Sequence, residues 1–182
     1  MKRRNFLTVA VTGVATQSLL AQKTVTTNTP PFVVKAGDAR FGVHTPYKGI
    51  NPNDLKISGK DTNGQLAVFE YIGNDKVGPS LHVHHEQDEI FSIIEGEFLF
   101  QVGDKQFTAK AGDTVFAPRK VPHTWIQLSE KSKIIYYVQP AGKMEEFFLT
   151  MNELKAPPTK EQAEEIHKAH GMTVLGPGLT IK

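Results

Sequence analysis

The stretch HVHHEQDE, residues 82–89, holds three of the seven histidines of the chain and three acidic residues. Side chains alternate between the two faces of a strand, so His82 and His84 point to the same side and can bind one ion together. Glu89 has the wrong parity for that strand. The polar residues before it predict a turn that starts a neighbouring strand, with Glu89 facing inward beside Phe91. The segment is therefore interpreted as part of a metal site.

A fourth ligand is available downstream, where His123 begins an apolar strand after a connection stiffened by prolines. If His123 points inward, Trp125 and Gln127 point the same way. Three imidazoles and one carboxylate predict one divalent transition metal. Mn, Fe or Ni is favoured, and Co, Cu and Zn also suit these ligands. An octahedral ion would keep two positions for water, dioxygen or substrate. The candidate substrate contacts are Phe91, Phe100, Trp125 and Gln127.

These residues must be positioned by strands, because the chain from residue 66 onward consists of short β-branched and aromatic runs separated by glycine turns. Such spacing predicts an antiparallel sandwich or small barrel. The expected strands are Leu66–Ile72, Leu81–His84, Glu89–Ile94, Glu97–Val102, Gln106–Ala109, Thr114–Ala117, His123–Leu128 and Lys133–Val138.

Two further patterns concern the outside of this barrel. IFSII, residues 90–94, is almost continuously apolar, so we expect both faces of that strand to be covered, by a second subunit or by the chain ends. After Gly142, four apolar residues at helical spacing (Met144, Phe147, Phe148 and Met151) predict a helix that packs against the barrel or forms a lid over a pocket. A second short helix, starting at Thr159 with a capping box, runs to His170. His167 and His170 are expected to be surface or packing residues.

The metal-site residues also carry a family resemblance. The first motif of the cupin family, HxHx(3–4)Ex(6)G, is matched at His82, His84, Glu89 and Gly96. The second, Gx(5)PxGx(2)Hx(3)N, is matched at Gly112, Pro118 and His123. Lys120 replaces its second glycine and Gln127 its asparagine, which leaves the metal ligands intact. The resemblance implies an all-β fold, the cupin double-stranded β-helix or jelly-roll barrel, with a C-terminal helical segment, and it implies a homodimer.

Within that family, LHVHHEQDEIFSIIEGEFLF and the tail HGMTVLGPGL resemble the quercetin 2,3-dioxygenase-like cupins. The resemblance implies ring-opening dioxygenation of a flavonol with release of carbon monoxide. It also implies that Glu89 is the catalytic base toward the substrate hydroxyl. Two alternatives remain: a non-catalytic cupin that binds a small molecule or metal, and an oxygen-independent isomerase or decarboxylase.

The N-terminus has the pattern of an export signal. Three basic residues precede an apolar run that ends near Ala21. The arginine pair followed by Asn5, Phe6 and Leu7 resembles the bacterial twin-arginine signal, whose route carries folded proteins; an ordinary secretion signal is the alternative. Polar residues interrupt the run, so we expect no stable membrane anchor. We expect a periplasmic or secreted protein with a signal peptide over 1–21, a linker over 22–37 and a single domain over 38–182, with helices from about residue 143.

The composition limits which partners and metal ligands the chain can use. The formal net charge of +2 includes Lys2, Arg3 and Arg4, and removing them leaves −1 for a chain that starts at Gln22. No basic patch then remains for nucleic acid. The chain has no cysteine, which excludes disulfides and thiolate ligands, so a metal must be held by nitrogen and oxygen. The expected partners are a small-molecule substrate, dioxygen and a second copy of the chain.

Overall fold

The structure is a computed structural model that describes residues 29–181. The expected signal peptide over 1–21 and the first part of the expected linker, residues 22–28, lie outside these residues. Within them, no helix has the length and apolar character needed to cross a bilayer.

The described chain forms two five-stranded sheets whose neighbouring strands all pair antiparallel. The first sheet has the order β1-β2-β9-β4-β7. Its strands are β1 (Asn53–Ile57), β2 (Ala67–Gly73), β9 (Ser132–Gln139), β4 (Asp88–Glu95) and β7 (Thr114–Ala117). The second sheet has the order β10-β3-β8-β5-β6. Its strands are β10 (Met172–Gly176), β3 (Leu81–His84), β8 (His123–Gln127), β5 (Glu97–Val102) and β6 (Lys105–Lys110).

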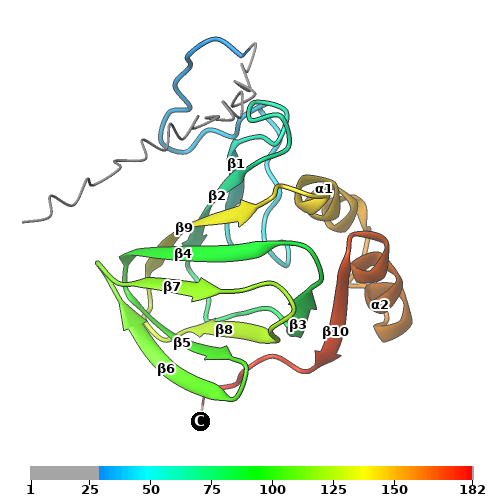
Figure 1. Cartoon of the computed structure of the whole chain (residues 1–182). Helices are drawn as coiled ribbons and strands as arrows, with labels where there is room; N and C mark the ends of the chain where they lie inside the picture. The colour runs from blue at the N-terminus through cyan, green and yellow to red at the C-terminus, as the bar shows by residue number, and fades with distance from the viewer. Residues whose placement is uncertain (1–28, 182) are drawn as a thin grey trace, which may run out of the picture.

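The two sheets curve around a shared interior, as Figure 1 shows. Alternation in β5 explains how the core is built. Phe98 and Phe100 face inward and are at most 1% exposed, whereas Glu97, which precedes them, is exposed. Aromatic rings continue the core into the first sheet, where Phe91 packs 5.3 Å from Phe100 between ring centroids. The prediction of an all-β, double-stranded β-helix is confirmed.

Two strands were not expected from the sequence. β1 has the sequence NDLKI, which contains few residues of high strand propensity, and it is held by antiparallel pairing to β2. β10 follows a helix and pairs with β3, with Val174 opposite His82. Both are edge strands, whose backbone is ordered by the neighbouring strand more than by their own side chains. β10 matters for the site because it encloses β3 from the side opposite β8.

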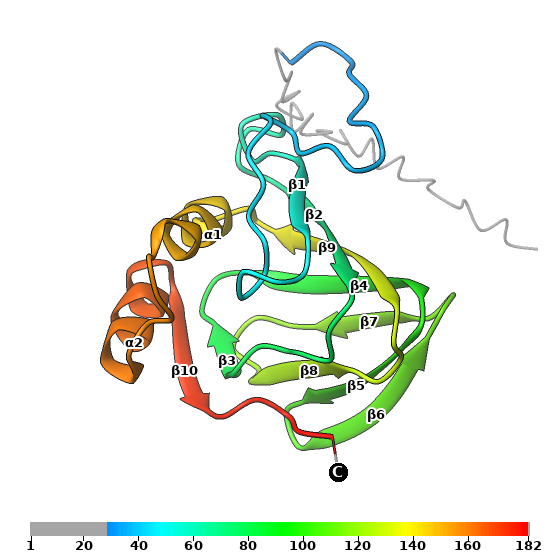
Figure 2. The same cartoon turned by 180° about the vertical axis from the view of Figure 1, so that it is seen from behind.

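The C-terminal helical segment is present as α1 (Met144–Glu153) and α2 (Lys160–Ala169). Figures 1 and 2 show both helices at one end of the barrel, beside β10. Met144, Phe147 and Phe148 form the buried stripe of α1, so the helix packs against the barrel as the spacing predicted. α2 begins with the expected capping box, in which Thr159 and Gln162 exchange side-chain and backbone hydrogen bonds.

The outer face of β4 is partly exposed in the single chain. Ile94 is 51% exposed, and Phe116 on the adjacent β7 is 56% exposed. Within residues 29–181 no segment fully covers this face, and the expectation that a second subunit or the chain ends cover it stays a prediction. A continuous apolar run indicates that exposing either face of the strand to water is unfavourable. It does not indicate whether the residues that cover each face belong to the same chain. A second subunit remains the expected cover.

Candidate metal centre

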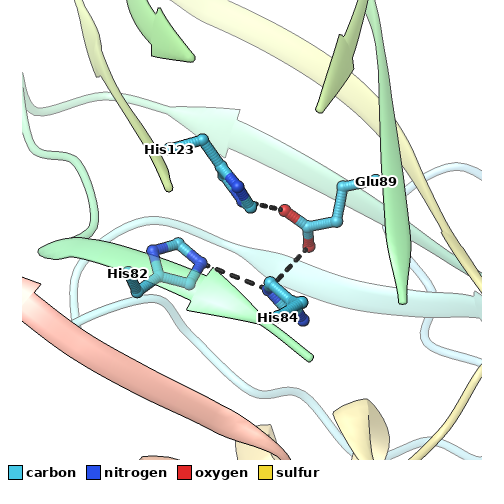
Figure 3. A group of neighbouring side chains, drawn as sticks. All are labelled: His82, His84, Glu89 and His123. Atoms are coloured by element: carbon cyan, nitrogen blue, oxygen red, sulfur yellow. Dashed lines mark hydrogen bonds and ion pairs between the residues drawn. The ribbon is translucent and has the colours of Figure 1, made fainter. Parts of the chain in front are cut away.

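His82, His84, Glu89 and His123 converge inside the barrel, and Figure 3 shows their side chains pointing toward one another. One ligand atom from each residue lies within 4.8 Å of the others. The four residues are between 0% and 8% exposed. The Nε2 atoms of His82 and His84 are 3.2 Å apart, and Nε2 of His123 is 2.9 Å from Oε2 of Glu89. The sequence prediction that these four residues share one site agrees with this geometry.

Strand geometry explains the convergence. His82 and His84 lie two positions apart on β3 and face inward together. The turn after β3 changes the parity, so that Glu89 near the start of β4 also faces inward. β3 pairs with β8 in a register that sets His82 opposite His123. Two strands of one sheet and one strand of the other therefore supply the four side chains.

The loop before His123 keeps its shape despite the departure from the family motif. Lys120 stands where the motif has glycine, and its φ of 65° lies in the left-handed region that favours glycine. Its backbone N–H donates to the carbonyl of His84 across 2.7 Å. This hydrogen bond helps to hold a conformation that costs a non-glycine residue about 1 kcal/mol. The substitution thus leaves His123 in register with β3.

Each histidine uses its other ring nitrogen in a hydrogen bond. Nδ1 of His82 donates to the carbonyl of Ser80 at 2.8 Å, and Nδ1 of His123 donates to the carbonyl of Val121 at 3.1 Å. Nδ1 of His84 donates to Oε1 of Gln87 at 3.4 Å. A carbonyl oxygen can only accept, so these bonds place a proton on Nδ1 and leave Nε2 to face the site. This is the arrangement that metal-binding histidines use in proteins.

Burial and the neighbouring charges set the protonation states. Burial lowers the pKa of His82 to about 3, helped by His123 and His84. Burial also lowers the pKa of His84. For His123, burial opposes the charged form, but the hydrogen bond and charge of Glu89 raise its pKa. Burial likewise opposes the charged form of Glu89, but His84 and His123 bring its pKa down to about 2. The metal-free site thus holds an ion pair between Glu89 and His123.

These residues fit a divalent transition metal. His82 and His84 are neutral near pH 7, and with Nδ1 protonated their Nε2 lone pairs face each other across 3.2 Å. Two lone pairs at that distance repel, and a cation coordinated by both nitrogens removes the repulsion. Three imidazole nitrogens and a carboxylate also match the donor preference of first-row divalent ions. Binding would displace the proton of His123 toward solvent, as metal ligands require.

The aromatic residues expected to contact substrate lie in the core around the site. The ring centroid of Phe91 is 6.4 Å from that of His123, and Phe100 packs behind Phe91. Trp125 is 6% exposed and packs edge-on against Tyr71 at 5.0 Å. Phe91 therefore borders the four-residue site, whereas Phe100 and Trp125 form the packing behind it. Their contact with a substrate stays a prediction.

Gln127 lies further along β8 and is fully buried. Its Nε2 donates to the backbone carbonyls of Gly73, Ser129 and Glu130, and its Oε1 accepts from the Tyr71 hydroxyl. A Cβ on Gly73 would meet Gln127 Oε1 at 1.7 Å, so the two residues fit closely together. The amide is thus committed to closing that end of the barrel, and the prediction that it binds substrate has no support in these contacts.

Two residues lie near the site although the sequence analysis did not place them there. Tyr47, in the segment before β1, packs against Trp125 with 6.1 Å between ring centroids. Burial raises the pKa of Tyr47, and the charges of Tyr71 and Glu89 raise it further. His167 of α2 lies 6.4 Å from His82 and 4.8 Å from Phe147. His167 was expected to be a surface or packing residue, and its contact with Phe147 supports the packing alternative. Its approach to a metal-site histidine was not expected. No local pattern marks either residue, because both reach the barrel through tertiary contacts.

The fold and site define a class of protein: a double-sheeted antiparallel barrel with a buried three-histidine, one-glutamate cluster. Residues 68–138 match the family model described as "Cupin domain". This match identifies a cupin domain within the chain, and a solved cupin shares the fold.

Individual relatives are distant. The curated "Uncharacterized protein MJ1618" of Methanocaldococcus jannaschii is 42% identical over 43 residues, which cover 24% of this chain and about a third (34%) of that protein. KdgF from Halomonas sp. has a TM-score of 0.50 at 16% identity, covering 62% of this chain and 94% of that one. An RmlC-like cupin from Shewanella frigidimarina has a TM-score of 0.52 at 16% identity, and the match covers 64% of this chain and 96% of that one.

A structure described as a predicted oxalate decarboxylase from Thermotoga maritima has a TM-score of 0.50 at 15% identity, covering 60% of this chain and 99% of that one. At such identities the likeness shows the fold alone, and the activity named for that protein belongs to that protein.

Proposed function

We propose that this chain is an exported, metal-dependent cupin oxidoreductase, a dioxygenase that acts on a flavonol-like or other aromatic or enol small molecule. The observation that carries the proposal is the convergence of three histidine Nε2 atoms and the Glu89 carboxylate within 4.8 Å in an aromatic barrel. The quercetin 2,3-dioxygenase-like sequence around these residues supports the same reading.

The four side chains would hold one divalent metal, which supplies Lewis acidity and a place for dioxygen and a substrate oxygen. In the metal-free site Glu89 is ionised near pH 7, because the neighbouring histidines hold its pKa well below the ordinary value. It can therefore accept the proton of an acidic phenolic or enolic hydroxyl placed within hydrogen-bond reach. Phe91 and the neighbouring aromatic rings exclude water around the site, which strengthens the charge interactions there.

The metal favoured for this role is Mn, Fe or Ni, and the proposed export route supports that choice. Affinity for nitrogen and oxygen ligands rises toward copper, so a weaker binder is best loaded where copper and zinc are scarce. Folding in the cytoplasm before twin-arginine export would load the metal there, and the exported protein would be periplasmic or secreted. Protein isolated from its native periplasm with only Cu or Zn bound would contradict this proposal.

The test combines metal analysis with oxygen uptake. Elemental analysis of the natively exported protein should find near-stoichiometric metal, and oxygen uptake should follow addition of a flavonol. Glu89→Gln keeps the size of the side chain and should lower turnover by about 100-fold or more, since general base catalysis contributes that much. Glu86→Gln is the matched control, because Glu86 is exposed in the adjacent turn. Full activity in Glu89→Gln would reject the base role.

The burial of the site favours a second candidate function. All four side chains are at most 8% exposed, as in a module that holds a metal or small molecule without turning it over. In that case the protein would contain metal but show no oxygen uptake with any substrate of the panel. An oxygen-independent isomerase or decarboxylase would convert substrate anaerobically, and product analysis under nitrogen separates it from the binding module.

A further inference from the structure

Gln87 is a buried polar residue in an unusual place. It lies in the turn between β3 and β4, directly after the exposed pair His85 and Glu86, yet only 3% of its surface is exposed. A buried amide needs hydrogen-bond partners, because leaving one unpaired costs about 1–3 kcal/mol. Gln87 has two such partners: the metal-site residue His84 and the backbone of Ala141, which precedes α1.

The two hydrogen bonds determine how the amide is oriented. Nε2 of Gln87 donates to the backbone carbonyl of Ala141 across 3.2 Å. A carbonyl cannot donate, so the NH2 group must face Ala141 and the oxygen must face His84. Oε1 then accepts from Nδ1 of His84 at 3.4 Å. The Ala141 carbonyl thereby selects, through Gln87, the tautomer of His84 whose Nε2 faces the other three side chains.

We propose that Gln87 is a positioning residue for the metal site, which fixes the tautomer and ring orientation of His84 and ties this ligand to the segment leading into α1. The proposal rests on metal binding as part of the proposed function, but it is independent of the reaction that follows. Gln87 touches His84 and not the reacting atoms, so its effect is exerted through the ligand.

Gln87 is also the one Nδ1 partner of the three that a side-chain substitution can remove. His82 and His123 donate to the backbone carbonyls of Ser80 and Val121, which remain whatever side chain is present. The His84 hydrogen bond is the longest of the three, at 3.4 Å against 2.8 and 3.1 Å. Its strength therefore depends on how closely the surrounding segments hold the amide in place.

Gly142 shows that the segment before α1 is shaped around this amide. A Cβ at Gly142 would lie 2.0 Å from Nε2 of Gln87, which no packing adjustment short of moving the amide can accommodate. Gly142 also has a φ of 53°, in the left-handed region. Gly171 has a φ of 79°, but a Cβ there would lie 3.9 Å from Oε1 of Gln87, an ordinary contact. The two glycines thus differ in whether a methyl group displaces Gln87.

The first experiment measures Co²⁺ binding to the full chain by visible absorption and by competition with a chelator of known affinity. Gln87→Met keeps the length and burial of the side chain but removes both hydrogen bonds. We expect it to weaken Co²⁺ binding by about 10- to 100-fold, the range for losing a partner of a metal-bound histidine, and to change the Co²⁺ spectrum. A merely structural role would instead lower the urea midpoint of the metal-free protein and leave the spectrum unchanged.

The second experiment displaces the amide from a distance. Gly142→Ala should weaken Co²⁺ binding and alter the spectrum as Gln87→Met does, whereas Gly171→Ala, which carries a similar backbone strain, should not. Wild-type affinity and spectrum in Gln87→Met would overturn the proposal, and equal effects of the two glycine variants would remove the link to the α1 segment. Wild-type protein that binds no Co²⁺ would overturn the proposed function as well, so the two failures are distinguishable.

Discussion

His123 donates a hydrogen bond from Nε2 to Oε2 of Glu89 across 2.9 Å, and this contact joins β8 of one sheet to β4 of the other. His123 also donates from Nδ1 to the Val121 carbonyl, so the metal-free ring carries a proton on both nitrogens. A metal that binds Nε2 takes the place of one proton. Metal binding near neutral pH should therefore release protons, a signal that calorimetry in buffers of different ionisation enthalpy can count.

Adjacent histidines provide a sharp test of the metal centre. His84 is fully buried in the cluster, whereas its neighbour His85 is exposed and bonds to Thr173. His84→Ala should abolish stoichiometric metal binding, and His85→Ala should retain it. In the wild type, metal at 100 times its dissociation constant should stabilise the fold by about 2.7 kcal/mol, seen as a raised Tm. Equal metal content in both variants would contradict the assigned ligand set.

Acid should destabilise the metal-free protein below about pH 6.5. His82 has a pKa of about 3 when folded and about 6.5 when unfolded, so between these values the unfolded chain binds a proton that the folded chain does not. His84 acts in the same direction. His123 opposes it, because a raised pKa contributes stability at low pH that is lost as pH rises through the folded value. The two histidines with lowered pKa outweigh His123, so the free energy of unfolding falls by on the order of 1 kcal/mol for each pH unit of acidification.

Urea unfolding of the chelator-treated protein between pH 7.5 and 5 measures this dependence. The midpoint should fall with pH in the wild type and fall less steeply in His82→Gln, which no longer titrates at that position. Glu89, with a folded pKa of about 2, adds a further loss only below its ordinary value of 4.5. A midpoint that stays constant from pH 7.5 to 5 would show that the histidines are not desolvated as described.

The turn that carries Tyr47 depends on one amide. Asn51 is fully buried, and its Nδ2 donates to the Tyr71 hydroxyl and to the Asp75 carbonyl. Its Oδ1 accepts from the backbone N–H groups of residues 74 and 75. Asn51→Ala leaves several buried groups without partners and should lower the free energy of unfolding by about 2 kcal/mol or more. Asn152→Ala, on the exposed side of α1, should change it by less than about 0.5 kcal/mol.

The exposed apolar face of the first sheet is the expected contact of a homodimer. Ile90 pairs with Phe116 on one side and with Tyr137 on the other, and Phe116 is 56% exposed. Phe116→Glu should shift the protein from dimer to monomer in light scattering at micromolar concentration, because a charge on a buried apolar contact is unfavourable. Phe41→Glu is the control, since Phe41 is 54% exposed but precedes β1. A monomeric wild type would contradict the dimer itself.

Residues close in the sequence were sufficient to predict three of the four cluster residues, and the proline-flanked strand start at His123 supplied the fourth. His82, His84 and Glu89 fall within eight positions, and the two-residue period of a strand together with one turn decides which way they face. The strand runs from β2 to β9 and the helix at α1 were predicted for the same reason, since each has a periodic apolar pattern of its own. The dioxygenase activity, the export route and the dimer remain predictions.

The tertiary structure alone decided what surrounds the cluster. β10 becomes a strand because β3 offers it a free edge, and the Gln127 amide is taken up by backbone carbonyls that the motif does not reveal. Gln87 belongs to the same turn as the ligands, yet its bond to Ala141 joins positions 54 residues apart. Local patterns record which face a side chain prefers. They do not record which distant group meets it, because those partners are brought together only when the two sheets and the C-terminal helices pack.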